Sequence, residues 1–129
     1  MSPRVSIIIV KYRAPRERAA CLASLKNYHV IVVDNDKINR GYAAGNNLGA
    51  KQAKSEYLLI LNPDTVVSPG AIESLTSFLD SHPKAGIVAP LLLDPSGRPY
   101  PLQGPRELTP LTGLVALSFL NRLPTPSSR

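Results

Sequence analysis

The sequence predicts an α/β fold with an open, mainly parallel sheet, because short apolar runs alternate with segments of helical pattern. Three runs rich in β-branched or other apolar residues, at 5–10, 30–33 and 57–61, are typical of strands buried on both faces. The chain has 129 residues, enough for one compact domain, and its hydrophobic fraction of 43% supports a packed core.

Two helices are predicted between these strands. The segment 15–26 begins with a proline, which is tolerated in the first turn of a helix, and it places Cys21 and Leu25 on one side. The segment 41–53 is rich in glycine and alanine, and we expect it to form a turn that leads into a helix. Each helix therefore follows one strand and precedes the next, as in a parallel sheet.

A third helix is expected after the last of these strands. Ser68 is the predicted cap and Pro69 the predicted first helical residue, and His82-Pro83 is expected to end the helix. A fourth strand is predicted over 86–89.

The sequence Asp-Pro-Ser-Gly at 94–97 is a strong turn signal, with proline second and glycine fourth. We expect it to join 91–93 and 98–100 as a small hairpin. The sequence thus divides into a main domain over 1–103 and an apolar helical tail over 104–129. An apolar surface on this tail favours a homodimer or peripheral contact with a membrane.

The net charge of +6 fits an anionic ligand or surface, although the basic residues are scattered along the chain, which is typical of a solvated face. Nucleic acid is not expected as a partner, because aromatic residues make up 5% of the chain and tryptophan is absent. The single cysteine, Cys21, allows no intrachain disulfide, and no signal peptide is visible. We therefore expect a cytoplasmic protein.

Polar residues follow each predicted strand: Lys11-Tyr12, Asp34-Asn35 and Asn62-Pro63-Asp64. Ligands of open α/β sheets bind at the carboxyl ends of the strands, so these residues are candidates for a binding site. Asp34 suits hydrogen bonds from a base or ribose, or it forms a turn that leaves the strand. Asp64 suits Mg²⁺ or Mn²⁺ bound to a diphosphate, or it lies in a capped turn.

The glycine-rich segment 39–49 is a further candidate. Small residues allow the backbone to approach a bulky ligand, and free N–H groups at a helix start favour an anion. The segment lacks the G-x-G of dinucleotide sites and the Gly-Lys-Ser/Thr of a Walker A loop. Tight contact between helix and sheet, without a ligand, is the alternative.

Four motifs in order, VSIIIVKY at 5–12, VIVVDN at 30–35, NRGYAAGNNLG at 39–49 and YLLILNPDT at 57–65, resemble family 2 glycosyltransferases, especially rhamnosyltransferase-like members. The resemblance runs from about residue 4 to 102 and implies the Rossmann-like, nucleotide-sugar-binding half of the GT-A fold. It implies an inverting transferase that moves a sugar from a UDP- or dTDP-sugar to a glycan or lipid-linked acceptor.

The resemblance also implies roles for individual residues. Tyr12 and Asp34 would line the nucleoside pocket, and Gly45 would lie near the ribose and diphosphate. Asp64 would bind Mg²⁺ or Mn²⁺ with the diphosphate, while Asn62 stands where the family carries the first aspartate of its D-x-D motif. The complete predicted nucleotide-sugar site is Tyr12, Asp34, Asn35, Gly41, Gly45, Asn46, Asn62 and Asp64.

Two departures from the family pattern affect these expectations. Only residues 36–38 separate the second strand from the glycine-rich segment, so a helix and an edge strand of the family should be missing, leaving 30–33 nearer the sheet edge. The later acidic segment that supplies the catalytic base is not found, and Glu107 is the only acid after Asp94. The alternative function is therefore a donor-binding module without turnover.

Overall fold

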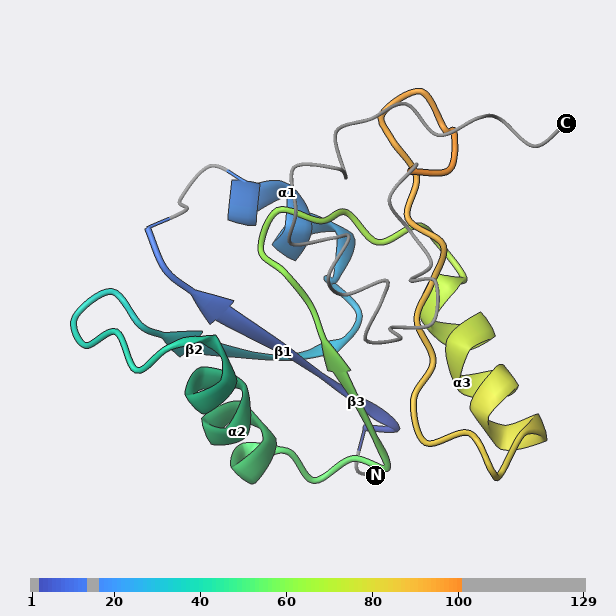
Figure 1. The fold of residues 1–129 in the computed structure, drawn as a ribbon, viewed down its shortest axis with the longest axis horizontal. Helices are drawn as coiled ribbons and strands as arrows, with labels where there is room; N and C mark the ends of the chain where they lie inside the picture. Colours follow the sequence, from blue (N-terminus) through green and yellow to red (C-terminus); the bar gives the residue numbers. More distant parts are fainter. Residues whose placement is uncertain (1–2, 14–16, 101–129) are drawn as a thin grey trace, which may run out of the picture. The chain divides into compact units, whose positions relative to one another are not determined.

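A computed structural model describes residues 3–13 and 17–100 of the chain. Within these residues the strands are β1 (Val5–Lys11), β2 (His29–Asp34) and β3 (Tyr57–Ile60), and the helices are α1 (Glu17–Ser24), α2 (Tyr42–Gln52) and α3 (Ala71–Ser81) (Figure 1). The chain divides into two compact units, residues 1–88 and residues 89–129. The six elements belong to the first unit, and the alternation of strand and helix confirms the predicted α/β class.

The sheet of the described residues is parallel, with the strand order β2-β1-β3. β1 lies in the centre because its apolar run is buried on both faces, and Ile7, Ile8 and Ile9 have no exposed surface. The register pairs Lys11 at the end of β1 with Asp34 at the end of β2. The carboxyl ends of these two strands are therefore level with each other.

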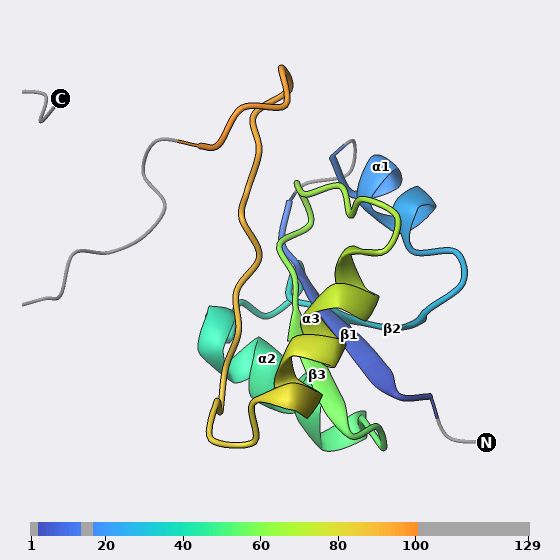
Figure 2. The same cartoon turned by 90° about the vertical axis from the view of Figure 1, so that its right-hand side faces the viewer.

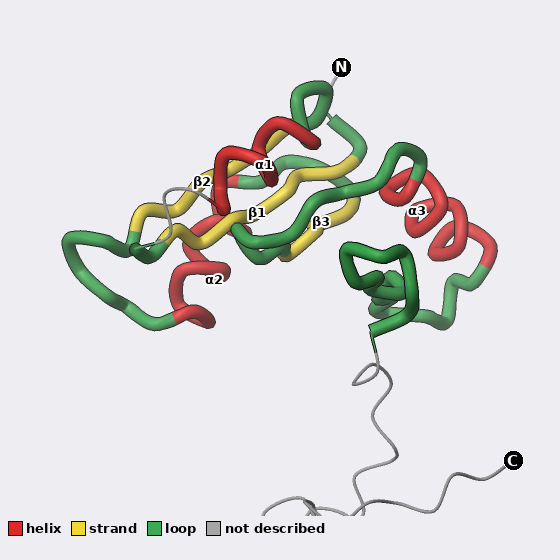
Figure 3. Tube along the Cα trace, turned by 90° about the horizontal axis from the view of Figure 1, so that it is seen from above, coloured by secondary structure: helices red, strands yellow, loops and turns green. Residues whose placement is uncertain are grey.

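Helices cover both faces of this sheet, with α1 on one side and α2 on the other (Figure 3). On one face, Ile7 and Ile9 form a core with Cys21 and Leu25 of the α1 segment and Ile72 of α3. Val10, Ile31 and Val33 form the core of the other face, which α2 covers through its contacts with β1 and β2. Successive side chains of β1 point to opposite faces of the sheet and therefore contribute to two separate cores.

The start of α3 differs from the prediction. The helix begins at Ala71 instead of Pro69, and its N-cap is Gly70 in the left-handed conformation, with φ 78°. The backbone N–H of Ala71 donates to the carbonyl of Ser68, so Ser68 lies in a turn before the helix and its side chain caps nothing. The predicted end is confirmed, since α3 stops at Ser81.

The predicted strand over 86–89 is wrong. After α3 the chain continues without a further helix or strand up to residue 92 (Figure 2). Ile87 is 91% exposed, and the boundary between the two compact units falls within this segment. Apolar β-branched residues favour a strand only where a neighbouring strand supplies hydrogen bonds, and the described residues offer none here.

The predicted hairpin is confirmed as a short one. Leu93 and Pro99 form an antiparallel bridge, and the N–H of Asp94 donates to the carbonyl of Arg98 at 2.8 Å. The carboxylate of Asp94 also accepts hydrogen bonds from both the N–H and the hydroxyl of Ser96, which close the turn. The predicted apolar helical segment at 104–129 lies outside the described residues.

β2 is an edge strand of the described sheet, since it pairs with β1 alone. Residues 35–41 after it form no helix or strand, so the missing helix and edge strand predicted from the short 36–38 segment are confirmed. Among the described residues, no helix is long and apolar enough to cross a bilayer.

Candidate functional site

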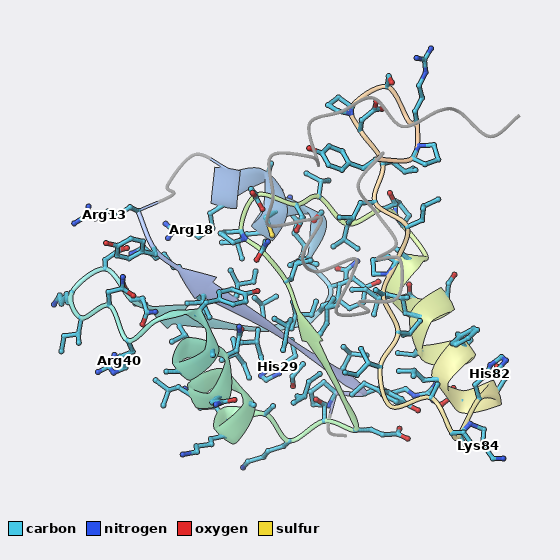
Figure 4. The ribbon with its side chains drawn as sticks, viewed as in Figure 1. Arg13, Arg18, His29, Arg40, His82 and Lys84 are labelled. Carbon is cyan, nitrogen blue, oxygen red and sulfur yellow. The ribbon has the colours of Figure 1, made fainter. Side chains whose placement is uncertain are left out.

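The candidate residues lie on one edge of the sheet because the three strands are parallel. β1 ends at Lys11, β2 ends at Asp34, and β3 leads into Asn62 through Leu61, whose N–H donates to the carbonyl of Ile8 on β1. Figure 4 shows Arg13 beyond the end of β1 and Arg40 on the loop after β2, on the same side of the molecule. The first turn of α2 follows that loop.

An ion-pair cluster joins the ends of β1 and β2. The ammonium of Lys11 lies 2.9 Å from Oδ2 of Asp34 and 2.6 Å from Oδ2 of Asp36. The pKa of Asp34 is lowered mainly because its carboxylate accepts the backbone N–H of Asp36, and also because Lys11 is adjacent. The pKa of Asp36 is lowered chiefly by Lys11. Both carboxylates therefore stay ionised, and Asp34 keeps an exposed surface at this edge.

Asn35 links β2 to the glycine-rich segment. Its backbone N–H donates to the carbonyl of Lys11, and its side-chain Nδ2 donates to the carbonyl of Gly41 at 3.2 Å. Gly41 has φ 82°, a backbone conformation that favours glycine, and it precedes α2 without a side-chain cap on the helix. Asn35 thus fixes the position of the start of α2 relative to the strand ends.

α2 approaches the sheet closely through its glycines. A Cβ on Gly45 would lie 2.8 Å from Cγ1 of Val10, and one on Gly49 would lie 2.5 Å from Cγ2 of Ile8. Gly45 is also next to Asn35, because the same Cβ would lie 3.4 Å from the Nδ2 atom of that side chain. The small residues of the motif therefore bring the helix start against the ends of β1 and β2.

Two buried amide oxygens have no hydrogen-bond donor among the described residues. They are Oδ1 of Asn35, a residue that is 2% exposed, and Oδ1 of Asn46, a residue that is 7% exposed. A buried acceptor without a donor costs free energy, so it is normally satisfied by water or a ligand. Asn35 is bonded to Gly41 just before α2, Asn46 lies within α2, and both oxygens need a donor of the O–H or N–H type.

Asn62 connects the end of β3 to α2. The hydroxyl of Tyr42, the first residue of α2, donates to Oδ1 of Asn62 at 2.9 Å. The carbonyl of Asn62 accepts the hydroxyl of Thr65 at 2.7 Å, which closes the turn that contains Pro63 and Asp64. Cys21 lies beneath this turn, and burial raises the pKa of its thiol.

Tyr12 and Asp64 stand apart from the other candidates. Tyr12 is 40% exposed, and the guanidinium of Arg13 lies 5.1 Å from the centre of its ring. Asp64 is exposed, and in the described part of the chain it makes no hydrogen bond or ion pair. Contacts therefore connect five of the predicted residues, Asp34, Asn35, Gly41, Gly45 and Asn62, whereas Tyr12 and Asp64 are open groups at the same edge.

In the described part of the chain, hollows lie at opposite ends of the sheet. The one at the candidate edge, about 330 Å³, is lined by Asp34, Lys37, Ile38 and Arg40. A larger one, about 420 Å³, lies at the amino ends of the strands, between β1, α3 and the turn before β2. The larger hollow is not the better candidate, because Tyr28 and Glu73 within it are hydrogen-bonded to each other.

The carboxyl edge of the sheet offers few protein ligands for a metal ion. The described residues contain no group of three His, Cys, Asp or Glu side chains that could hold an ion. Asp64 offers a free carboxylate, whereas Asp34 and Asp36 share the ammonium of Lys11 as their ion-pair partner. This set fits Mg²⁺ or Mn²⁺ only where one protein carboxylate is joined by phosphate oxygens of the substrate, a common arrangement for Mg²⁺.

The sequence named Lys11 as a candidate at a strand end without assigning it a role, and it did not identify Asp36 or Tyr42 as members of the site. The pairing of Lys11 with Asp34 could have been expected, because neighbouring parallel strands bring their carboxyl ends level with each other. The Tyr42–Asn62 hydrogen bond joins residues 20 apart and depends on how α2 packs, so no local signal predicts it.

The chain is similar to several curated proteins. It is 30% identical over 79 residues to the minor teichoic acid biosynthesis protein GgaB of Bacillus subtilis (strain 168), covering 60% of this chain and 9% of that protein. Over 46 residues it is 37% identical to an N-acetylglucosaminyl-diphospho-decaprenol L-rhamnosyltransferase of Mycobacterium tuberculosis, covering 36% and 15%. It is 31% identical over 86 residues to a poly-beta-1,6-N-acetyl-D-glucosamine synthase of Staphylococcus epidermidis, covering 67% and 21%.

The chain thus spans about a tenth to a fifth of the length of these relatives. No solved structure matches it significantly. The family model described as glycosyl transferase family 2 matches residues 7–103, which include β1 from Ile7 on, β2, β3, α2 and every candidate site residue. The chain belongs to glycosyl transferase family 2.

Proposed function

We propose that this chain binds the nucleotide-sugar donor of a glycosyltransferase at the carboxyl edge of its sheet. Membership of the family supports sugar transfer in general. The observation that carries the proposal is the linkage of the four motifs at this edge, through the Lys11–Asp34, Asn35–Gly41 and Tyr42–Asn62 contacts. These contacts arrange an ionised carboxylate, a helix start and the Asp64 turn around one edge.

Each group suits one part of a nucleoside diphosphate sugar. The exposed ring of Tyr12 can stack on a base, and the Asp34 carboxylate can accept hydrogen bonds from the base or ribose hydroxyls. The free N–H groups and the dipole at the start of α2 favour the diphosphate. The unpartnered oxygens of Asn35 and Asn46 favour a ligand rich in hydroxyl donors, or water beside it.

Asp64 is the residue that would hold Mg²⁺ or Mn²⁺ together with the diphosphate. A bound metal would act as a Lewis acid and stabilise the departing nucleoside diphosphate. Lys37 and Arg40 line the hollow beside Asp34 and add positive charge at the same edge. The chain's own residues thus bind and orient the donor, while the metal supplies charge stabilisation.

The proposal also covers the donor class, the acceptor class and the stereochemical outcome of the transfer. We take UDP- and dTDP-sugars as donor classes, a glycan or lipid-linked molecule as acceptor, and inversion as the stereochemical outcome. The names of two relatives, a decaprenol-linked rhamnosyltransferase and a poly-beta-1,6-N-acetyl-D-glucosamine synthase, support an acceptor of this kind. Cell-wall or polysaccharide biosynthesis is the setting that these names favour.

A donor-binding module without turnover is the second candidate function. The observation that favours it is the state of the acids at the candidate edge: the N–H of Asp36 and then Lys11 lower the pKa of Asp34, Lys11 lowers the pKa of Asp36, and Asp64 is proposed for the metal. A general base must accept the proton of the acceptor hydroxyl, and a carboxylate with a lowered pKa is a weak proton acceptor. Donor hydrolysis or transfer by the pure chain would exclude this second candidate.

Calorimetric titration with UDP and dTDP, with and without Mn²⁺, tests the proposal. We expect Mn²⁺ to strengthen binding to the wild type, and Asp64→Ala to weaken metal-dependent binding by about tenfold or more. Glu56→Ala is the matched control, because it removes an exposed carboxylate at the amino ends of the strands. Equal binding by wild type and Asp64→Ala would remove Asp64 from the site, and no binding by the wild type would refute the proposed function.

A further inference from the structure

The hydrogen bond between Tyr42 and Asn62 is the direct side-chain link between the glycine-rich segment and the turn that carries Asp64. Tyr42 begins α2, whereas Asn62 follows β3, and β1 lies between β2 and β3 in the sheet. The donor–acceptor distance of 2.9 Å is that of an ordinary hydrogen bond. The contact therefore spans the edge at which we propose that the diphosphate binds.

Both oxygen atoms of Asn62 already have protein donors. Oδ1 accepts the Tyr42 hydroxyl, and the backbone carbonyl accepts the hydroxyl and the N–H of Thr65, at 2.7 and 3.3 Å. Hard cations such as Mg²⁺ take oxygen ligands and require near-ideal geometry. An oxygen oriented toward a hydroxyl donor is poorly placed for such a cation, so Asp64 is left as the free ligand of this turn.

We propose that Tyr42 is a positioning residue for the diphosphate site and that Asn62 serves as the anchor of this link instead of as a metal ligand. The Tyr42 hydroxyl fixes the distance between the start of α2 and the Asp64 turn. The N–H groups at the start of α2 and the Asp64 carboxylate, which would hold the metal, would then be kept at a set spacing for the two phosphates. This inference rests on the proposed function and assigns a role to a residue outside the predicted site.

A purely structural role for Tyr42 predicts a different result from a positioning role. Tyr42 is 50% exposed, so water can replace its hydroxyl as the donor to Asn62, and the fold should tolerate the loss. A positioning role predicts that loss of the hydroxyl weakens the binding of the diphosphate and leaves the binding of the nucleoside unchanged. The ratio of UDP affinity to uridine affinity therefore separates the two roles.

The experiment compares wild type, Tyr42→Phe and Tyr57→Phe by titration with uridine and with UDP plus Mn²⁺. Tyr57 is the matched control, because its hydroxyl also donates to a side-chain oxygen, Oδ1 of Asp80 at 2.7 Å, but at the amino ends of the strands. We expect Tyr42→Phe to lower the UDP affinity about fivefold and to leave the uridine affinity and the melting temperature close to those of the wild type, whereas Tyr57→Phe should leave both affinities unchanged.

Asn62→Asp provides the second variant. The new carboxylate can still accept the Tyr42 hydroxyl, so we expect the dependence of UDP binding on Mn²⁺ to change by less than about twofold. A marked gain in Mn²⁺ affinity would show that position 62 faces the metal and would overturn the inference. Equal UDP affinity of wild type and Tyr42→Phe would also overturn it while leaving the proposed function intact, whereas no UDP binding by the wild type would refute both.

Discussion

At the amino ends of β1 and β3 the polar side chains are paired with one another, whereas at the carboxyl ends some side-chain oxygens have no partner among the described residues. Arg4 donates to both carboxylate oxygens of Asp80 at 2.6 Å, and the hydroxyl of Tyr57 donates to the same carboxylate. At the other edge, Asp64 is open, and the buried oxygens of Asn35 and Asn46 have no donor.

This difference separates an end whose polar groups stabilise the fold from an end at which we propose that the donor binds. Groups that satisfy one another hold the first and third strands and α3 together, and they have little left to offer a ligand. Groups left unsatisfied cost stability and are retained where a ligand or water completes them. Substitutions at the amino end should therefore change stability, and those at the carboxyl end should change binding.

The largest expected effect is a loss of stability on substitution of the glycines of α2, of which Gly45 lies near the proposed site and Gly49 packs on the core. A methyl group at Gly49 would meet the buried Ile8 at 2.5 Å, and one at Gly45 would meet Val10 at 2.8 Å. Overpacking outweighs the gain in helix propensity, so Gly49→Ala and Gly45→Ala should each lower the free energy of unfolding by about 1–2 kcal/mol in urea titrations.

The two glycine variants should differ in nucleotide binding. Gly45 lies beside Asn35 in the first turn of α2, so Gly45→Ala should also weaken UDP binding, whereas Gly49→Ala should leave it unchanged. Gly86→Ala is the control for the loss of glycine, because a Cβ there meets no atom within 4 Å. If Gly49→Ala impaired binding as strongly as Gly45→Ala, the separation of core and site along α2 would be wrong.

The next effect in size concerns the two carboxylates that share Lys11. Asp34→Ala should weaken UDP binding by about tenfold, because the base or ribose loses its acceptor. Asp36→Ala removes a carboxylate of equal charge, whose Oδ2 lies 2.6 Å from the ammonium of the same Lys11. It should weaken UDP binding by less than about threefold. Titration calorimetry at one fixed salt concentration measures both. Similar losses for the two variants would mean that charge alone, and not the position of Asp34, governs binding.

The fold class and the central strand could be predicted because their signals are local. A continuous apolar run such as 5–10 predicts a buried central strand in almost any α/β arrangement. A glycine in a loop followed directly by a helical pattern is an equally local signal for the start of a helix. The same local reasoning failed at Ser68, where Gly70 ended the turn in a left-handed conformation, and at 86–89, where no neighbouring strand was present.

The candidate site could be predicted in part. Strand ends identified Asp34 and Asn62 because parallel topology collects them on one edge, as the register of β1 and β2 shows. Tyr42 could not be found in this way, since its contact with Asn62 depends on the angle and depth at which α2 packs. The depth depends on the close approach of Gly45 to Val10. A glycine-rich pattern indicates such an approach but does not say which residue of the sheet the glycine meets.

The smallest effect is a pH dependence at the amino end. Hydrogen bonds from Tyr57 and Arg4 lower the pKa of Asp80 in the folded chain below the ordinary value of about 4. The stability that this carboxylate contributes is therefore present above pH ~4 and is lost as the pH falls through its folded pKa. Asp80→Asn should lower the melting temperature at pH 7 more than at pH 3. Equal differences in melting temperature at both pH values would show that the Arg4–Asp80–Tyr57 cluster does not stabilise the fold through the charge of Asp80. UDP binding by Asp80→Asn at pH 7 should match that of the wild type, because Asp80 lies at the amino end of the sheet and away from the proposed site.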